Sequence, residues 1–319
     1  MTRVRRALSG FLVIMAAVLL IGLLPSTAVA QATIAFTIKD PRIVSPAGLA
    51  GDTNAELYWT ANRTGDQSLI YGLTNSGTVT GTFNYRARPV DVAGLAMVGD
   101  TLYVGDIGDR NGSRNFVTVY LFDNPRASGL TVTYRAYDFR FPDGPRNAET
   151  LLVSEAGRIL LVTKDNDQGT IYAGPRSSSP LGMNRLTRVG TAPANVTDGV
   201  FLPGSEQFVL RTNTAVYLMD AANYRTLATV ELPSQPPGNA VAVGLDGESL
   251  LLGSTGRNAK VYSIPIPTEP VTATATPSPE PEEEEDETAL SGRGTLLAIG
   301  LAAVVAIVAG VVVGVIRDR

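Results

Sequence analysis

The segment LYVGDIGDRNGSRNFVTVY, residues 102–120, contains the pattern that decides the fold. It reads as an apolar strand, a charged loop and a second strand in which a β-branched residue precedes tyrosine. The same apolar stretch followed by a small or branched residue and tyrosine occurs in four other places, at intervals of 45–52 residues. The five tyrosines are Tyr71, Tyr120, Tyr172, Tyr217 and Tyr262. A repeat of this length is typical of the blades of a β-propeller.

Each repeat contains four short strand-like stretches bounded by Gly, Pro, Asn and Asp. The stretches of the first kind are 47–51, 93–97, 148–152, 197–201 and 240–244, and those of the second kind are 57–61, 102–106, 160–164, 207–211 and 250–254. The third stretch holds the tyrosine. The fourth alternates, at 81–85, 133–139, 186–190 and 226–232, and the segment 33–38 supplies a fifth example ahead of the first repeat.

These stretches predict an all-β protein, a β-propeller of about five four-stranded blades. Because the segment 33–38 precedes the first repeat, we expect this N-terminal strand to complete the last blade and close the ring. The pattern leaves two alternatives open, a six-bladed ring with one cryptic blade and a β-sandwich. The repeated tyrosines and Trp59 are predicted to pack inside the protein.

The N-terminus has the three parts of a secretory signal peptide. Three arginines precede an apolar run, and the small residues Ala28-Val29-Ala30 follow it. We therefore predict that residues 1–30 are a signal peptide, with a retained membrane helix as the alternative.

The C-terminus has the composition of a membrane anchor. The run 296–316 has no charge, and Arg317 and Arg319 follow it. This predicts a single transmembrane helix over 295–316 and a cytoplasmic tail over 317–319. Gly310 and Gly314 have the spacing of a helix-packing pair, which would allow a homodimer.

The segment 269–294 is rich in Pro, Thr and Glu, so we expect an extended, disordered stalk. The whole pattern predicts a single-pass protein of the cell membrane with an extracellular propeller over 31–268.

The composition excludes several classes of chemistry. The chain has no Cys and no His, so disulfides, His-ligated zinc and Ser-His-Asp or Cys-His nucleophile systems are excluded. Residues 31–268 contain 20 Lys and Arg against 21 Asp and Glu. Without a basic surplus, no nucleic-acid partner is expected.

The loop over 107–116 is longer than its counterparts in the other repeats. In a four-stranded blade, the turn between the second and third strands lies on the same face as the connection into the first strand. Loops on such a rim are the default place for function. The predicted ligand-binding residues on this rim are Asp106, Asp109, Arg110, Asn111, Arg114, Arg146, Asn147, Glu149, Lys164, Asp198 and Arg211.

Asp106, Asp109 and Glu149 carry the chemistry if the protein is an enzyme, because paired carboxylates can act as acid and base. The same three residues are the candidate calcium ligands, although neither 107–118 nor the stretch KDNDQG matches an EF-hand loop. Calcium is thus the one cofactor for which the sequence offers ligands, and no cofactor is required by it.

Residues 90–175 resemble a group of secreted actinobacterial β-propellers, described as WD-repeat-like or as relatives of the "esterase-like activity of phytase" propellers. The resemblance lies in LYVGDIGDRNGSR, in RNAETLLV and in GRILLVTK. Asp106, Ile107, Gly108 and Asp109 match the group, as do Arg146, Ala148 and Glu149, whereas Arg110 and Asn147 depart from it. The resemblance implies the propeller fold and the same two rim segments, but no defined activity.

Two functions fit these observations. The first is a cell-surface module that binds an envelope or extracellular ligand, a glycan, peptide or protein, on its rim. The alternative is a carboxylate- or calcium-dependent hydrolase, a phosphoesterase or glycosidase-like enzyme, that uses the same rim. The lack of a nucleophile system favours the binding module.

Overall fold

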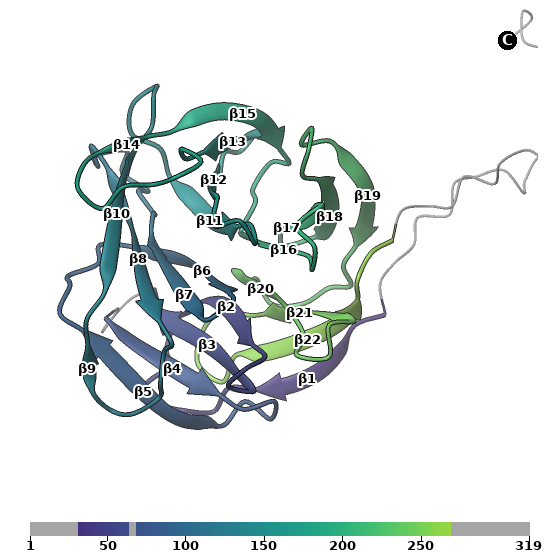
Figure 1. Cartoon of the computed structure of the whole chain (residues 1–319). Coiled ribbons are helices and arrows are strands. Elements are labelled where there is room, and N and C mark those ends of the chain that lie inside the picture. The colour runs from purple at the N-terminus through teal and green to yellow at the C-terminus, as the bar shows by residue number, and fades with distance from the viewer. Residues whose placement is uncertain (1–30, 64–67, 269–319) are drawn as a thin grey trace, which may run out of the picture. The chain divides into compact units, whose positions relative to one another are not determined.

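The computed structural model describes residues 31–63 and 68–268, which form a ring of five β-sheets around a central axis (Figure 1). The predicted signal peptide, stalk, transmembrane helix and glycine pair lie outside the described residues. Within the two described ranges, no helix is long and apolar enough to cross a membrane. The prediction of an all-β propeller with five blades is confirmed, and the six-bladed ring and the β-sandwich are wrong.

Each blade has four main strands in up-and-down order, with the first strand next to the axis. Blade 1 contains β2 (Pro46–Asp52), β3 (Leu57–Asn62), β4 (Leu69–Leu73) and β5 (Val79–Tyr85). Blade 2 contains β6 (Val92–Val98), β7 (Thr101–Asp106), β8 (Val117–Asp123) and β10 (Arg135–Arg140). Blade 3 contains β11 (Ala148–Val153), β12 (Ile159–Thr163), β13 (Gly169–Ala173) and β15 (Thr187–Ala192). Blade 4 contains β16 (Asp198–Phe201), β17 (Gln207–Arg211), β18 (Ala215–Asp220) and β19 (Thr226–Glu231).

Blade 5 closes the ring by joining the two ends of the described chain. It contains β20 (Ala240–Val243), β21 (Ser249–Gly253), β22 (Lys260–Pro265) and, as its outer strand, β1 (Thr33–Thr37). β1 pairs antiparallel with β22, from Thr33 opposite Ser263 to Thr37 opposite Lys260. The predicted closure by the N-terminal strand is therefore confirmed, and it removes the open edge that the last blade would otherwise present.

Two short strands that the sequence did not predict extend the outer edges of blades 1 and 2. β9 (Thr131–Val132) pairs with β5, and β14 (Asn184–Arg185) pairs with β10, both in parallel. Each comes from a connection within the next blade and lies against the preceding one. Strands of two residues leave no periodic signal in a sequence, so the hydrophobic pattern cannot predict them.

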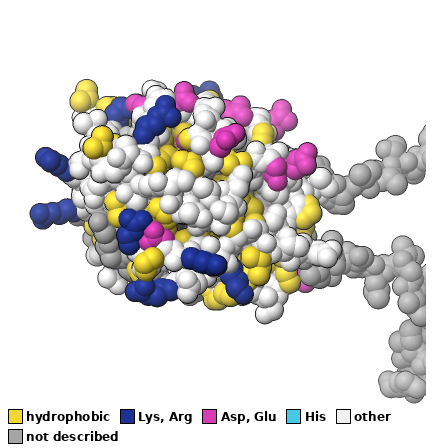
Figure 2. Space-filling view, turned by 90° about the horizontal axis from the view of Figure 1, so that it is seen from below, with side chains coloured by type: hydrophobic (Ala, Val, Ile, Leu, Met, Phe, Trp, Pro, Cys, Tyr) yellow, Lys and Arg dark blue, Asp and Glu magenta, His cyan; other side chains and the backbone are white. Residues whose placement is uncertain are grey.

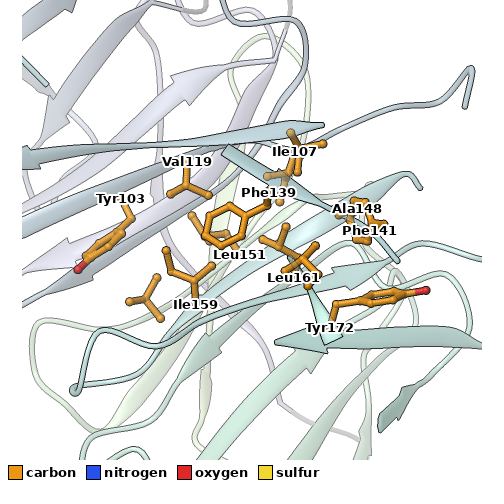
Figure 3. Close-up of a cluster of buried hydrophobic side chains, with 14 of the residues drawn as sticks. Tyr103, Ile107, Val119, Phe139, Phe141, Ala148, Leu151, Ile159, Leu161 and Tyr172 are labelled. Atoms are coloured by element: carbon orange, nitrogen blue, oxygen red, sulfur yellow. The ribbon is translucent and has the colours of Figure 1, made fainter. Parts of the chain in front are cut away.

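Five hydrophobic clusters fill the five seams between neighbouring blades. Each cluster includes one of the repeated tyrosines, of which Tyr71, Tyr120 and Tyr172 are buried and Tyr217 and Tyr262 half-buried. In the seam between blades 2 and 3, Phe139 lies among the side chains of both blades (Figure 3). Trp59 is fully buried in the seam between blades 1 and 2. The predicted packing role of these aromatic residues is confirmed.

The ring has two faces with different connections. The loop face carries the connections into the first strands and the turns between second and third strands. The turn face carries the five tight turns between first and second strands. Figure 2 shows the ring from the side, with acidic side chains gathered along the upper right and most Lys and Arg along the left and lower sides.

Candidate functional site

The β7–β8 loop over 107–116 is held from within by Asp109. The Asp109 carboxylate accepts hydrogen bonds from the backbone N–H groups of Ser113 and Arg114, both at 2.9 Å. Gly112 adopts a φ of 61°, a conformation that suits glycine, and its N–H donates to the carbonyl oxygen of Asp109 at 3.0 Å, which closes a turn at Asn111-Gly112. The backbone N–H of Asp109 donates to Asn147 Oδ1 at 2.7 Å, which fixes the loop to blade 3. The loop is therefore long but anchored.

Both carboxylate oxygens of Asp106 accept hydrogen bonds from residues of its own blade or of the connection that enters it. Arg114 donates to both of its carboxylate oxygens, at 2.9 and 3.0 Å. Asp106 Oδ1 also accepts from the backbone N–H groups of Val90 and Asp91, at 3.0 and 2.8 Å. Only 2% of Asp106 is exposed, so it has no oxygen on the surface to offer a ligand.

The blade repeat explains why an acceptor stands at position 106. Asn62 ends β3 in blade 1 as Asp106 ends β7 in blade 2. Asn62 Oδ1 accepts from the backbone N–H groups of Val44 and Ser45, at 3.0 and 3.1 Å, in the connection that enters blade 1. Both side chains thus satisfy the backbone of an incoming connection, which is a structural role.

Arg63 links three blades beneath the loop face. It follows β3 in blade 1, forms a bidentate pair with Glu149 on β11, and contacts Asp91 ahead of β6, with Nε 2.7 Å from Asp91 Oδ1. The side chains of Arg63 and Glu149 are 6% and 4% exposed. Burial alone would lower the pKa of Arg63, but its hydrogen bonds and charge interactions with Glu149 and Asp91 outweigh burial and raise that pKa.

Asp198 and Arg211 tie blade 4 to blade 5. They lie opposite each other on β16 and β17, and both are fully buried. Arg211 Nη1 donates to the carbonyl oxygens of Ala240 and Gly253 at 2.6 and 2.7 Å, while Asp198 Oδ2 accepts from the N–H of Val241 at 2.8 Å. Burial raises the pKa of Asp198 and lowers that of Arg211 to about 10.

Replacing Asp198 by Asn should change how stability depends on pH. Because the pKa of Asp198 is higher in the folded protein than its ordinary value of 3.8, the folded state binds this proton more tightly. The stabilisation that protonated Asp198 contributes is complete at a pH below its pKa in the unfolded chain. It is lost as the pH rises through its raised pKa in the folded protein. We expect the unfolding free energy of the wild type, minus that of Asp198→Asn, to fall with rising pH above pH 4, by at most about 1.4 kcal/mol per pH unit. Urea unfolding of both proteins across acidic pH measures this difference, and a flat or rising difference would contradict the assignment.

The other predicted residues divide into paired and exposed side chains. Arg146 pairs with Asp143 at 2.7 Å, and Asp143 also accepts from the hydroxyl of Tyr172 at 2.7 Å. Burial, together with Asp143, raises the pKa of Tyr172 to about 12. Lys164 is half-buried and Asn111 is exposed. The side chain of Arg110 is 62% exposed, with Nε 3.8 Å from Asp91 Oδ2.

The structure therefore brings most of the predicted residues to one face but buries most of their charges in pairs. The three candidate calcium ligands have separate partners: Arg114 for Asp106, the loop backbone for Asp109 and Arg63 for Glu149. Within 31–63 and 68–268, no three acidic residues form a group that could hold a metal ion. Calcium binding stays a prediction, and thermal melting with calcium and then with a chelator tests it.

Sequence reasoning missed two features. Arg63 stands at the end of a second strand, and its partners Asp91 and Glu149 belong to other repeats. A cavity of about 570 Å³ opens on the turn face, lined by residues of all five blades. The acidic residues of the five tight turns between first and second strands are a sequence signal for this face, which lies opposite the long 107–116 loop.

No family model matches this chain, and no curated protein matches it in sequence. The resemblance to secreted actinobacterial propellers stays a prediction, while the propeller fold itself is shown by the structure.

Proposed function

We propose that the protein is a non-catalytic binding module, held outside the cell by its C-terminal segment, that binds an anionic ligand on its loop face. The observation that carries the proposal is the β7–β8 loop, whose base is fixed by Asp109 and Asn147 while Arg110, Asn111 and Ser113 are exposed at its tip. A rigid loop with exposed polar side chains loses little conformational entropy when it binds a ligand.

Unpaired positive charge on the loop face favours an acidic glycan or acidic peptide. Several exposed or half-buried cations of the loop face form no ion pair with any described residue: Lys39, Arg86, Arg88, Lys164 and Arg257. Such a surface attracts anions and speeds their association. The alternative hydrolase gains no support from the geometry, because Asp106 and Glu149 are buried in bidentate pairs with arginines.

Binding of the full chain to polygalacturonate, to poly-glutamate and to neutral dextran tests the proposal. We expect one of the two anionic polymers to bind, and the double variant Arg110→Ala with Asn111→Ala to weaken it about tenfold. Asp109→Ala should also weaken binding, because it loosens the loop without removing an exposed contact residue. Arg126→Ala, an exposed arginine on the turn face, is the matched control.

Titration calorimetry at two salt concentrations gives these affinities. Equal affinity for dextran, or equal affinity of the tip variant and the wild type, would refute the loop-face site. Consumption of either polymer would refute the non-catalytic assignment.

A further inference from the structure

The cavity of the turn face has the size and lining of a small-molecule site. Its volume of about 570 Å³ lies within the range of roughly 300–1,000 Å³ that is common for ligand pockets. Its walls are the ends of the five first strands, and Met97, Val98, Phe201, Val243 and Leu245 there are only half-buried. An apolar ligand group could cover this surface and exclude water from it.

The turns around this cavity carry a concentrated negative charge. They contain six acidic residues and a single basic residue, Arg158, and a seventh acid, Asp52, ends β2. The acids of the turns are Glu56, Asp100, Glu155, Glu206, Asp246 and Glu248, of which Glu155 and Asp246 line the cavity. None of them forms an ion pair with any residue in the described part of the chain. A cleft with charges of one sign and low-dielectric walls concentrates ligands of the opposite charge.

Most of these carboxylates also have fixed positions. Asp52 accepts from Trp59 Nε1 at 3.0 Å, Asp100 from Asn54 at 2.7 Å, and Glu155 from the N–H of Gly204 at 2.7 Å. The last contact joins blade 3 to blade 4. Asp246 accepts from the N–H groups of Glu248 and Ser249, and these hydrogen bonds keep its pKa below the ordinary value. Hydrogen bonds therefore hold these four carboxylates in place.

We infer that the turn-face cavity is a second binding site, which takes a small amphiphilic organic cation. The apolar part of the ligand lies against the ends of the first strands, and its cationic group faces the acidic turns. This site is on the opposite face of the ring from the proposed loop-face site and has the opposite charge preference.

Three compounds with the same apolar part test the inference: 4-phenylbutylammonium, neutral 4-phenylbutan-1-ol and anionic 4-phenylbutyrate. The full chain is held in phosphatidylcholine nanodiscs, and empty nanodiscs correct for partitioning into lipid. We expect the cation to bind about tenfold more tightly than the alcohol and the alcohol more tightly than the anion. High salt should reduce this preference.

Two pairs of variants locate the site. Glu155→Gln with Asp246→Asn, at the two acids that line the cavity, should weaken binding of the cation about fivefold and leave binding of the alcohol unchanged. Asp167→Asn with Glu231→Gln on the loop face should change neither. Met97→Trp fills the cavity and should abolish binding of both compounds, with Val90→Phe on the loop face as its control. Val243→Phe provides a second filled cavity, and the melting temperature shows which variants fold.

Two results would overturn the inference. One is equal affinity for the cation, the alcohol and the anion, which would remove the role of the acidic turns. The other is unchanged cation binding in a folded cavity-filling variant, which would place any binding elsewhere on the protein.

Discussion

Replacing Arg211 by Met should lower the free energy of unfolding by about 3–5 kcal/mol, one of the two largest effects that we expect from a single substitution. Met keeps much of the apolar volume but cannot donate to the carbonyl oxygens of Ala240 and Gly253. It also leaves the buried Asp198 without the opposite charge beside it. These hydrogen bonds join blade 4 to blade 5, and no ion pair among the described residues connects these two blades, so their loss weakens the ring at this seam.

Urea unfolding of the full chain measures this loss as a shift of the midpoint at an unchanged slope. Arg225→Met, an exposed arginine on the turn face, is the control, and it should stay within about 0.5 kcal/mol of the wild type. An Arg211→Met protein that is as stable as this control would show that the buried guanidinium contributes nothing to the seam.

The second large effect is expected from Arg63→Met, again about 3–5 kcal/mol. The substitution leaves Glu149 buried, with the amide of Asn147 at 3.2 Å as a remaining partner, and it also removes the cation beside Asp91. Breaking a buried ion pair from one side is costly because an uncompensated charge stays inside the protein. Thermal melting and urea unfolding measure the effect.

Arg86→Met, an exposed arginine of the same face, should be nearly neutral and is the matched control. If Arg63→Met unfolds at the same urea concentration as Arg86→Met, the ion pairs of Arg63 with Glu149 and Asp91 do not stabilise the fold.

The architecture could be predicted from the sequence because a blade is a local unit. Its four strands follow one another along the chain, and the tyrosine marks the same place in each repeat. The closing strand could also be predicted, because 33–38 is an outer-strand pattern with no blade before it. β9 and β14 could not be predicted, since each is two residues long and pairs with the preceding blade.

The candidate site was predictable in position but not in chemistry. The up-and-down order correctly places Asp106, Asp109 and Glu149 on one face. It does not say that Glu149 pairs with Arg63, which is 86 residues away in the chain and two blades distant. Side-chain partners across the axis depend on how the blades pack, and the repeat pattern contains no information on this. The equivalence of Asn62 and Asp106 was visible in the repeat and would have indicated a structural role for Asp106.

We assign the buried charges of the loop face a structural role: they hold the blades together and do not bind a ligand or act in catalysis. A double-mutant cycle of Arg63→Met, Glu149→Gln and the combined variant tests it most directly. We predict that the combined variant loses about 2–3 kcal/mol less unfolding free energy than the two single variants lose together. The reason is that removing both charges leaves neither partner of the Arg63–Glu149 pair buried and unpaired. Additive losses, within about 0.5 kcal/mol, would contradict the claim and return Glu149 to the candidates for ligand binding or catalysis.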